Sequence, residues 1–119
     1  MKLVKKFTFD SAHFLPNYAG KCKQLHGHTY TLDVIIDGKV NPDTGMVMDF
    51  FDVDYIVKSK ILPSLDHHCL NDVVPNPTVE NVALYILAAL KHDIKDFELG
   101  IRLWETASGY VELQGSDCT

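Results

Sequence analysis

The sequence HGHTYTLDVIID, residues 26–37, carries the strongest structural signal in the chain. After its two histidines, every second residue is apolar: Tyr30, Leu32, Val34 and Ile36. The other parity of the strand includes Thr29, Thr31 and Asp33. This period of two is typical of a β-strand with one face in a hydrophobic core. The sequence therefore predicts a strand over His26–Asp37, followed by a turn that begins at Asp37-Gly38.

Three further segments alternate in the same way. They run from Leu3 to Phe14, from Glu98 to Glu105 and from Gly109 to Leu113. We expect Pro16 to end the first of these strands, because proline cannot donate to a β-ladder. The last two strands are joined by Thr106-Ala107-Ser108 and are predicted to form a hairpin.

Two helices are predicted between the strands. Asp52 can cap a helix with one apolar stripe, and Pro63 would end it. Thr78 can cap a second helix, whose wider apolar stripe indicates contacts on more than one side. We expect a short extended piece over Met46–Phe50 and a loop between Pro63 and Pro77.

The order strand, strand, helix, helix, strand, strand predicts an α+β fold, with an antiparallel four-stranded sheet and both helices on one face. With 119 residues, 46% of them hydrophobic, the chain is predicted to be a single domain over residues 1–119. An open sheet of this kind has two unpaired edges, which proteins usually cover or pair. Oligomerisation is therefore expected.

Composition excludes several classes of function. The chain has 16 acidic against 11 basic residues, a net charge of −5 and no basic block longer than two residues, which argues against nucleic-acid binding. Its longest uncharged apolar run, Val82–Leu90, is about half the roughly 20 residues that a membrane span needs. Three cysteines without a CxxC motif, and a basic start without an apolar stretch behind it, predict free thiols and a cytoplasmic location.

Five of the six histidines fall in three short segments. His26 and His28 lie two residues apart on the predicted strand, so their side chains share a face about 7 Å apart. His13 ends the first strand, and pairing of the two strands would bring it beside them. Three imidazoles without an obvious fourth ligand match a catalytic zinc site with an open position. The alternative is a solvated strand start with a packed His13.

Cys22 lies in a polar loop between two lysines, four residues before His26. Neighbouring cations and a metal favour a thiolate, which can act as a base or a nucleophile, although many loop cysteines are inert. Asp66 and His67 are adjacent in a loop, and a carboxylate that orients an imidazole is a common acid–base arrangement. The alternative is a turn aspartate beside an exposed histidine.

Glu105 follows Trp104 on a strand that is otherwise rich in apolar residues. An acidic residue at this position has two interpretations. It is either an exposed alternate position of the strand, or a hydrogen-bond acceptor aimed into a pocket.

Short motifs occur in order over nearly the whole chain. They are Ser11-Ala-His13-Phe14, Cys22-Lys-Gln-Leu-His26-Gly-His28, Gly45-Met-Val-Met-Asp49-Phe50, Leu65-Asp66-His67, Leu70-Asn71-Asp72, Pro77-Thr78-Val-Glu80-Asn81 and Trp104-Glu105-Thr106. Together they resemble the 6-pyruvoyl-tetrahydropterin synthase superfamily. The three-residue gap between Cys22 and His26 resembles the bacterial 6-carboxy-tetrahydropterin synthases of queuosine biosynthesis, whereas the animal-type biopterin enzymes have a longer gap.

The resemblance implies the tunnelling fold and an assembly. In the family, three subunits join their sheets into a barrel and two trimers stack into a hexamer, with pterin sites at subunit interfaces. A homo-hexamer of this kind would close the open sheet edges. The implied partner is a small-molecule pterin triphosphate, and because the chain is acidic, Lys21 and Lys23 are candidates to meet the phosphates by their proximity to Cys22.

The resemblance also implies roles for individual residues. The zinc ligands would be His13, His26 and His28. Cys22 would be the general base on the substrate side chain, and Asp66 with His67 the partner relay for proton transfer. Glu105 would accept hydrogen bonds from the amino group and a ring nitrogen of the pterin. Thr78 and Glu80 would lie near the same pocket.

The reaction implied by the resemblance is that of a zinc-dependent lyase. It would convert 7,8-dihydroneopterin triphosphate to 6-carboxy-5,6,7,8-tetrahydropterin, acetaldehyde and triphosphate. One alternative is a 6-pyruvoyl-tetrahydropterin synthase or a dihydroneopterin aldolase-type relative that uses the same pterin. Another is a non-catalytic protein that binds zinc or a pterin.

Overall fold

The two longest strands, β1 (Lys2–His13) and β2 (His26–Asp37), form an antiparallel hairpin inside the sheet. In the computed structural model, which describes residues 1–117, every residue of β1 faces a residue of β2, as far as His13 opposite His26. The alternation of apolar and polar residues fixes this register, because a slip by one position would turn the apolar side chains to the other face. Both predicted strands are confirmed.

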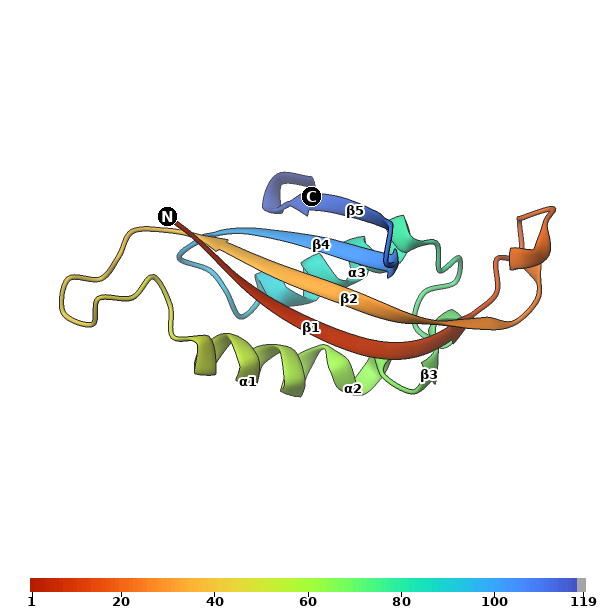
Figure 1. Cartoon of the computed structure of the whole chain (residues 1–119), viewed down its shortest axis with the longest axis horizontal. Helices are drawn as coiled ribbons and strands as arrows, with labels where there is room; N and C mark the ends of the chain where they lie inside the picture. The colour runs from red at the N-terminus through yellow and green to blue at the C-terminus, as the bar shows by residue number, and fades with distance from the viewer. Residues whose placement is uncertain (118–119) are drawn as a thin grey trace.

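The strands follow the order β3-β1-β2-β4-β5 across the sheet (Figure 1). β4 (Glu98–Thr106) pairs antiparallel with β2, and β5 (Gly109–Gln114) pairs antiparallel with β4, which confirms the predicted C-terminal hairpin. β3 (His68–Cys69) pairs in parallel with Ser11 and Ala12 of β1. The predicted sheet of four strands is thus corrected to five, since a two-residue strand is too short to show a period of two.

Helix α1 (Phe50–Lys60) begins earlier than predicted. Asp49 caps it, because its Oδ1 accepts the backbone N–H of Phe51 at 2.9 Å. The predicted cap at Asp52 is therefore wrong, and this residue lies in the first turn, where its negative charge suits the helix dipole. The predicted extended piece over Met46–Phe50 is also wrong, because Phe50 already belongs to the helix and Met46 forms only an isolated bridge.

Pro63 does not end the first helix. The helix already ends at Lys60, and a short helix, α2 (Leu62–Leu65), follows with Pro63 in its first turn. Proline is tolerated there because the first N–H groups of a helix have no partner within it. The rest of the segment predicted to be a loop contains β3 and a 3-10 turn, η2 (Leu70–Asp72).

Helix α3 (Val79–Lys91) begins as predicted, with Thr78 Oγ1 accepting the backbone N–H of Asn81 at 3.1 Å. Its wide apolar surface is also confirmed, because it packs against both β4 and β5 and also contacts α1. Its buried residues are Val82, Ala83, Ile86, Leu87 and Leu90. Among residues 1–117, no helix has both the length and the apolar character that crossing a membrane requires.

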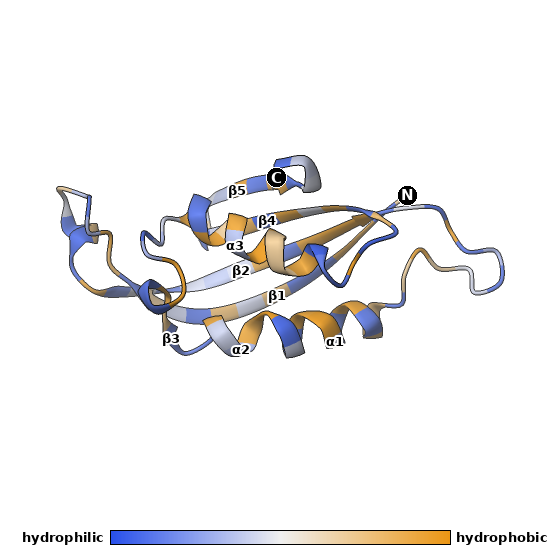
Figure 2. Cartoon of the chain, turned by 180° about the vertical axis from the view of Figure 1, so that it is seen from behind, coloured by the Kyte–Doolittle hydropathy of each residue, from blue (hydrophilic) through white to orange (hydrophobic). Residues whose placement is uncertain are grey.

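The hydrophobic core lies between the helices and one face of the sheet. Seen from behind, α1 and α3 both lie on this face (Figure 2). The strands contribute Phe7, Phe9, Tyr30, Leu32, Val34, Ile36, Leu99, Ile101 and Leu103. Burial of each large aliphatic side chain stabilises the fold by about 1.5–3 kcal/mol. The other face of the sheet is polar. There the buried carboxylate of Asp33 accepts a hydrogen bond from Trp104 Nε1 at 2.9 Å and forms an ion pair with Lys6 at 2.8 Å.

The sheet has incompletely paired edges within the described chain. β3 covers the outer side of β1 only at Ser11 and Ala12. β5 is the last strand of the sheet and pairs only with β4. Exposed edges of this length are rarely left open, because their backbone groups can pair with another chain.

Candidate functional site

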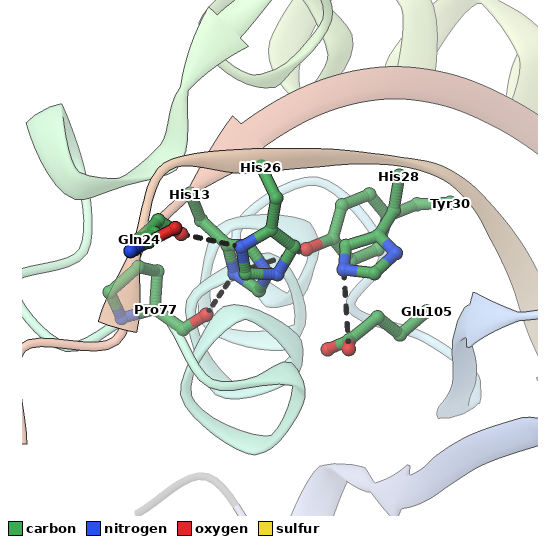
Figure 3. A network of polar contacts seen from close by, with 7 residues as sticks. All are labelled: His13, Gln24, His26, His28, Tyr30, Pro77 and Glu105. Atoms are coloured by element: carbon green, nitrogen blue, oxygen red, sulfur yellow. Dashed lines mark hydrogen bonds and ion pairs between the residues drawn. The ribbon is translucent and has the colours of Figure 1, made fainter. Parts of the chain in front are cut away.

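Three histidines converge at one end of the β1–β2 hairpin (Figure 3). The register places His13 directly opposite His26, and His28 lies two residues further along the same face of β2. The ring centroids are separated by 4.6 Å for His13 and His26, 5.1 Å for His13 and His28, and 4.9 Å for His26 and His28. One ligand nitrogen of each lies within 4.8 Å of the others. These residues could hold a metal ion.

Backbone carbonyls fix two of the imidazoles in one tautomer. His13 Nδ1 lies 2.8 Å from the carbonyl oxygen of Pro77, and His26 Nδ1 lies 2.7 Å from that of Gln24. Because a carbonyl can only accept, each Nδ1 carries the proton and each Nε2 has a free lone pair. The two Nε2 atoms lie 3.1 Å apart. Two lone pairs at this distance repel unless a proton or a cation lies between them.

His28 completes the donor set. Its Nε2 is buried and forms no hydrogen bond among residues 1–117, although the carboxylate of Glu105 approaches it to 3.4 Å. Burial lowers the pKa of His28. The nearby carboxylate of Glu105 raises this pKa, but by less than burial lowers it, so the neutral imidazole is favoured. Buried polar atoms without partners are rare in folded proteins. A cation bound by three neutral imidazoles would satisfy all three Nε2 atoms, and this donor set suits zinc better than magnesium or calcium.

Glu105 lies beside the cluster, with its Oε1 3.4 Å from His28 Nε2 (Figure 3). It sits where the pairing of β4 with β5 shifts register between Trp104 and Thr106. Such bulges re-aim a side chain and recur next to active sites. Its side chain is 28% exposed, so the carboxylate is open to a ligand. The carboxylate of Glu105 thus points toward the histidine cluster.

The start of α3 forms another wall of the site. Pro77, which contacts His13, is buried, and Thr78 follows it directly. The Thr78 hydroxyl is half-buried and is engaged in the helix cap. Glu80 lies exposed in the first turn of α3. Thr78 is thus at the edge of the site, whereas no hydrogen bond or ion pair links Glu80 to it within residues 1–117.

Cys22 lies in the loop that leaves β1 and returns to β2, on a 3-10 turn, η1 (Lys21–Lys23). This loop extends beyond the end of the hairpin (Figure 1). The carbonyl oxygen of Cys22 accepts the N–H of Leu15 at 2.8 Å. Its thiol is half-buried, is not in a disulfide and forms no hydrogen bond with the described residues. Within residues 1–117, the thiol of Cys22 therefore has no bonded partner.

Asp66 and His67 face each other, although neighbours in sequence often point apart. His67 Nδ1 lies 3.0 Å from Asp66 Oδ1. The backbone of Asp10 holds both residues, because Asp10 N–H donates to Asp66 Oδ1 at 3.0 Å and His67 N–H donates to the Asp10 carbonyl at 2.6 Å. His67 has a φ of 58°, a left-handed conformation that is uncommon outside glycine. The predicted carboxylate–imidazole pair is thus formed.

This pair lies apart from the histidine cluster of the same chain. His67 lines an open hollow that extends to His28 and includes Asp10 and Thr29. The side chains of Asp10 and Thr29 project from the sheet face opposite to that of His13 and His28, because residues alternate along a strand. The Asp66–His67 pair, whose ligand atoms lie within 4.8 Å of that of Asp10, is therefore a second group, distinct from the three histidines.

Several groups of the site could not be found from sequence motifs. Two are the carbonyls of Gln24 and Pro77, which carry no side-chain signal. The third is Tyr30, which the alternation assigns to the core. It is indeed buried, but its hydroxyl lies 3.3 Å from His13 Nδ1. Burial raises the pKa of Tyr30, so it remains a neutral neighbour of the imidazole.

Comparison with known proteins gives a consistent result along the whole chain. The family model described as 6-pyruvoyl tetrahydropterin synthase matches residues 2–116. A 6-carboxy-5,6,7,8-tetrahydropterin synthase of Haemophilus influenzae is 38% identical, over 95% of this chain and 98% of that protein. A 6-pyruvoyl tetrahydrobiopterin synthase of Dictyostelium discoideum is 37% identical, over 95% of each. A dihydroneopterin monophosphate aldolase of Pyrococcus furiosus is 34% identical, over 95% of this chain and 96% of that protein.

Solved structures show the same architecture. The 6-pyruvoyl tetrahydropterin synthase of Caenorhabditis elegans superposes with a TM-score of 0.87 at 26% identity, over 97% of this chain and 95% of that one. The enzyme of the same name from Plasmodium vivax gives a TM-score of 0.78 at 21% identity, over 96% of each chain. The expected α+β tunnelling fold is therefore confirmed, with the fifth strand as the correction.

Proposed function

Since the chain belongs to the 6-pyruvoyl tetrahydropterin synthase family and is an enzyme of the lyase type, we propose that it is a zinc-dependent carbon–carbon lyase. It converts 7,8-dihydroneopterin triphosphate and water to 6-carboxy-5,6,7,8-tetrahydropterin, acetaldehyde and triphosphate, a reaction of queuosine biosynthesis. The three-residue gap between Cys22 and His26 and the full-length similarity to the Haemophilus protein support this branch of the family.

The observation that carries the proposal is the histidine cluster with Glu105 beside it. Zinc held by His13, His26 and His28 would polarise an oxygen of the substrate side chain, so that a proton on the neighbouring carbon is removed at neutral pH. Glu105 is 3.4 Å from His28, so a pterin whose ring bonds to this carboxylate has its side chain directed at the cluster. The metal ligands and the ring anchor are thus placed for one small substrate.

Proton transfer falls to Cys22 and the Asp66–His67 pair, which are not among the three clustered histidines. Cys22, as a thiolate, removes a proton from the substrate side chain, and His67 returns one while Asp66 keeps its imidazole oriented. Cys22 precedes His26 by only four residues, so its loop is close enough in sequence to close over the histidines of its own chain. Asp66 and His67 lie beside Asp10, whose side chain projects from the sheet face opposite to that of the cluster, and we infer that they serve the site of a neighbouring subunit.

A homo-hexamer built from two trimers is the assembly that we propose. The incompletely paired outer sides of β1 and β5 support sheet pairing between subunits. Such an assembly also brings lysines of several chains together for the triphosphate of the substrate, with Lys21 and Lys23 beside Cys22 as the first candidates. Because the mechanism needs the free thiol of Cys22, the reducing cytoplasm is the compartment that suits it.

A second candidate is a pyruvoyl-forming or aldolase-type reaction on a related pterin. The relatives from Dictyostelium and Pyrococcus, at 37% and 34% identity, favour it. A non-catalytic pterin- or zinc-binding protein has less support, because such a protein would need none of Cys22, the Asp66–His67 pair and Glu105.

The experiment that tests the proposal is incubation of the zinc-loaded protein with 7,8-dihydroneopterin triphosphate, followed by mass spectrometry of the products. We expect 6-carboxy-5,6,7,8-tetrahydropterin together with acetaldehyde. A 6-pyruvoyl product or an aldolase cleavage product would assign the second candidate. No turnover by zinc-loaded protein of native oligomeric state would contradict both reactions.

A further inference from the structure

Asn71 binds the backbone directly after His13. The N–H of Phe14 donates to Asn71 Oδ1 at 3.0 Å, and Asn71 Nδ2 donates to the carbonyl oxygen of Phe14 at 2.9 Å. The β1–β2 pairing ends at His13 opposite His26, so Phe14 has no ladder partner in β2. The Asn71 amide therefore replaces a strand neighbour and fixes the backbone where β1 gives way to the loop.

Asn81 binds the backbone just before Pro77. Asn81 Nδ2 donates to the carbonyl oxygen of Asn76 at 2.8 Å, and Thr78 N–H donates to the same oxygen at 2.9 Å. Pro77 lies between Asn76, which accepts both bonds, and Thr78, and its ring restricts φ. The next carbonyl along the chain, that of Pro77, is thereby aimed in one direction, toward His13 Nδ1 at 2.8 Å.

We propose that Asn71 and Asn81 are positioning residues for the metal site, acting on His13 from its two sides. Neither amide touches the imidazole. Asn71 acts through the backbone of Phe14, and Asn81 acts through the carbonyl of Pro77. The inference rests on the proposed function in one respect only, that His13 binds a metal ion.

The reason for this arrangement is the burial of His13. Its side chain is fully buried, and its Nε2 lies 3.1 Å from that of His26, so a small rotation would lose the common focus of the donors. Ligating groups have to be held to within about 0.5 Å of their working geometry. The hydrogen bond from Nδ1–H to a partner that only accepts also keeps the lone pair on Nε2, where a metal needs it.

The test is the Zn²⁺ affinity of the metal-free protein and of two variants, Asn71→Asp and Asn81→Asp, measured by competition with a chromogenic chelator without pterin. A carboxylate keeps the shape and an acceptor oxygen but cannot donate to the Phe14 or Asn76 carbonyl. We expect each variant to bind Zn²⁺ about 10- to 100-fold more weakly. The added negative charge alone would act in the opposite direction.

The matched control is Asn41→Asp. Asn41 Oδ1 accepts the N–H of Asp43 at 2.8 Å in an exposed turn, and an aspartate keeps that bond. This variant adds the same charge and should bind Zn²⁺ as the unmodified protein does. If circular dichroism shows that an aspartate variant is unfolded, the corresponding alanine variant, Asn71→Ala or Asn81→Ala, is measured in its place. The alanine variants add no charge.

A readout without metal separates positioning from general stability. The ¹⁵N shifts of the His13 ring in the metal-free protein should show the Nδ1–H tautomer, with a shift toward Nε2–H in Asn81→Asp. Folded variants that keep both the affinity and the tautomer would overturn the inference and leave the proposed function standing. Absence of Zn²⁺ binding by the unmodified protein would instead overturn the zinc dependence, and the inference with it.

Discussion

The histidine cluster and the Asp66–His67 pair both lie against β1, yet the protein holds them in opposite ways. His13 is fully buried, and its imidazole is fixed by the carbonyl of Pro77. The side chain of His67 is 77% exposed, and its residue is held through backbone bonds to Asp10. The imidazole of His13 is thus oriented in the interior of the protein, whereas that of His67 is exposed on its surface.

This difference indicates that the histidine cluster and the Asp66–His67 pair have different roles. A metal site needs donors fixed before the metal arrives, and the cluster has them within one chain. The proposed proton relay has to reach a reacting atom, and the Asp66–His67 pair lies beside Asp10, whose side chain projects from the face opposite to that of the cluster. We therefore propose that the pair serves the cluster of a second subunit.

The largest expected effect comes from the cluster itself. His26→Ala removes one of the three Nε2 donors and leaves His13 facing an empty position, so we expect metal content to fall from about one ion per chain to near zero. His92→Ala, an exposed histidine at the end of α3, is the control and should keep its metal. Inductively coupled plasma mass spectrometry measures both, and equal zinc in the two variants would rule out the three-histidine site.

The next effect separates metal binding from proton transfer. Cys22→Ala should keep its zinc while kcat falls by about 10²- to 10⁴-fold, the range over which general base catalysis contributes. Ser59→Ala, which shortens an exposed side chain on α1, is the control and should change kcat little. Steady-state kinetics and metal analysis of the same preparations are required. Loss of zinc from Cys22→Ala would make this thiol a ligand instead of the base.

Glu105→Gln tests the carboxylate at the mouth of the cluster. A hydrogen bond to a charged group contributes about 1.5–3 kcal/mol, so pterin binding should weaken roughly 10- to 100-fold while zinc content stays unchanged. Glu112→Gln, on the polar face of the sheet beside Arg102, is the matched control. Calorimetric titration with a pterin that lacks the triphosphate measures the change. Unaltered affinity would remove Glu105 from the substrate site.

The smallest effect concerns Asp66. Its bond from the Asp10 N–H, followed by its contact with His67, holds the pKa of Asp66 below the ordinary value of 3.8. A depressed folded-state pKa stabilises the protein above the unfolded value, and this stabilisation is lost as the pH falls through the folded pKa. Asp66→Asn should therefore lower the Tm slightly at neutral pH and not at strongly acidic pH. Scanning calorimetry at both pH values tests this, and an equal Tm difference at both would contradict it.

Much of the fold could be predicted because the signal repeats. The strand over His26–Asp37 has an apolar residue at every second position from Tyr30 to Ile36, and one register buries all of them. The start of α3 could be predicted equally well, because Thr78 precedes a long apolar stripe. In contrast, β3 has two residues, and the competition between Asp49 and Asp52 for the helix cap depends on where the preceding turn ends. Such choices are made by tertiary packing.

The candidate site divides in the same manner. His26 and His28 could be paired from their spacing, and His13 followed from strand pairing. The carbonyls of Gln24 and Pro77, which set the tautomers, could not be predicted because backbone groups are the same at every position. The position of Asp66 relative to the cluster could not be predicted either, because it depends on where the chain crosses the edge of β1.

The most direct test of the shared site is complementation between two inactive variants, Cys22→Ala and His67→Ala, assembled together. If one site takes Cys22 and His67 from different subunits, random assembly leaves about a quarter of the sites intact. We expect the mixture to recover turnover approaching that fraction, whereas Cys22→Ala mixed with a Cys22→Ala/His67→Ala double variant recovers none. A mixed oligomer, verified by native mass spectrometry, that stays inactive would contradict a site shared between subunits.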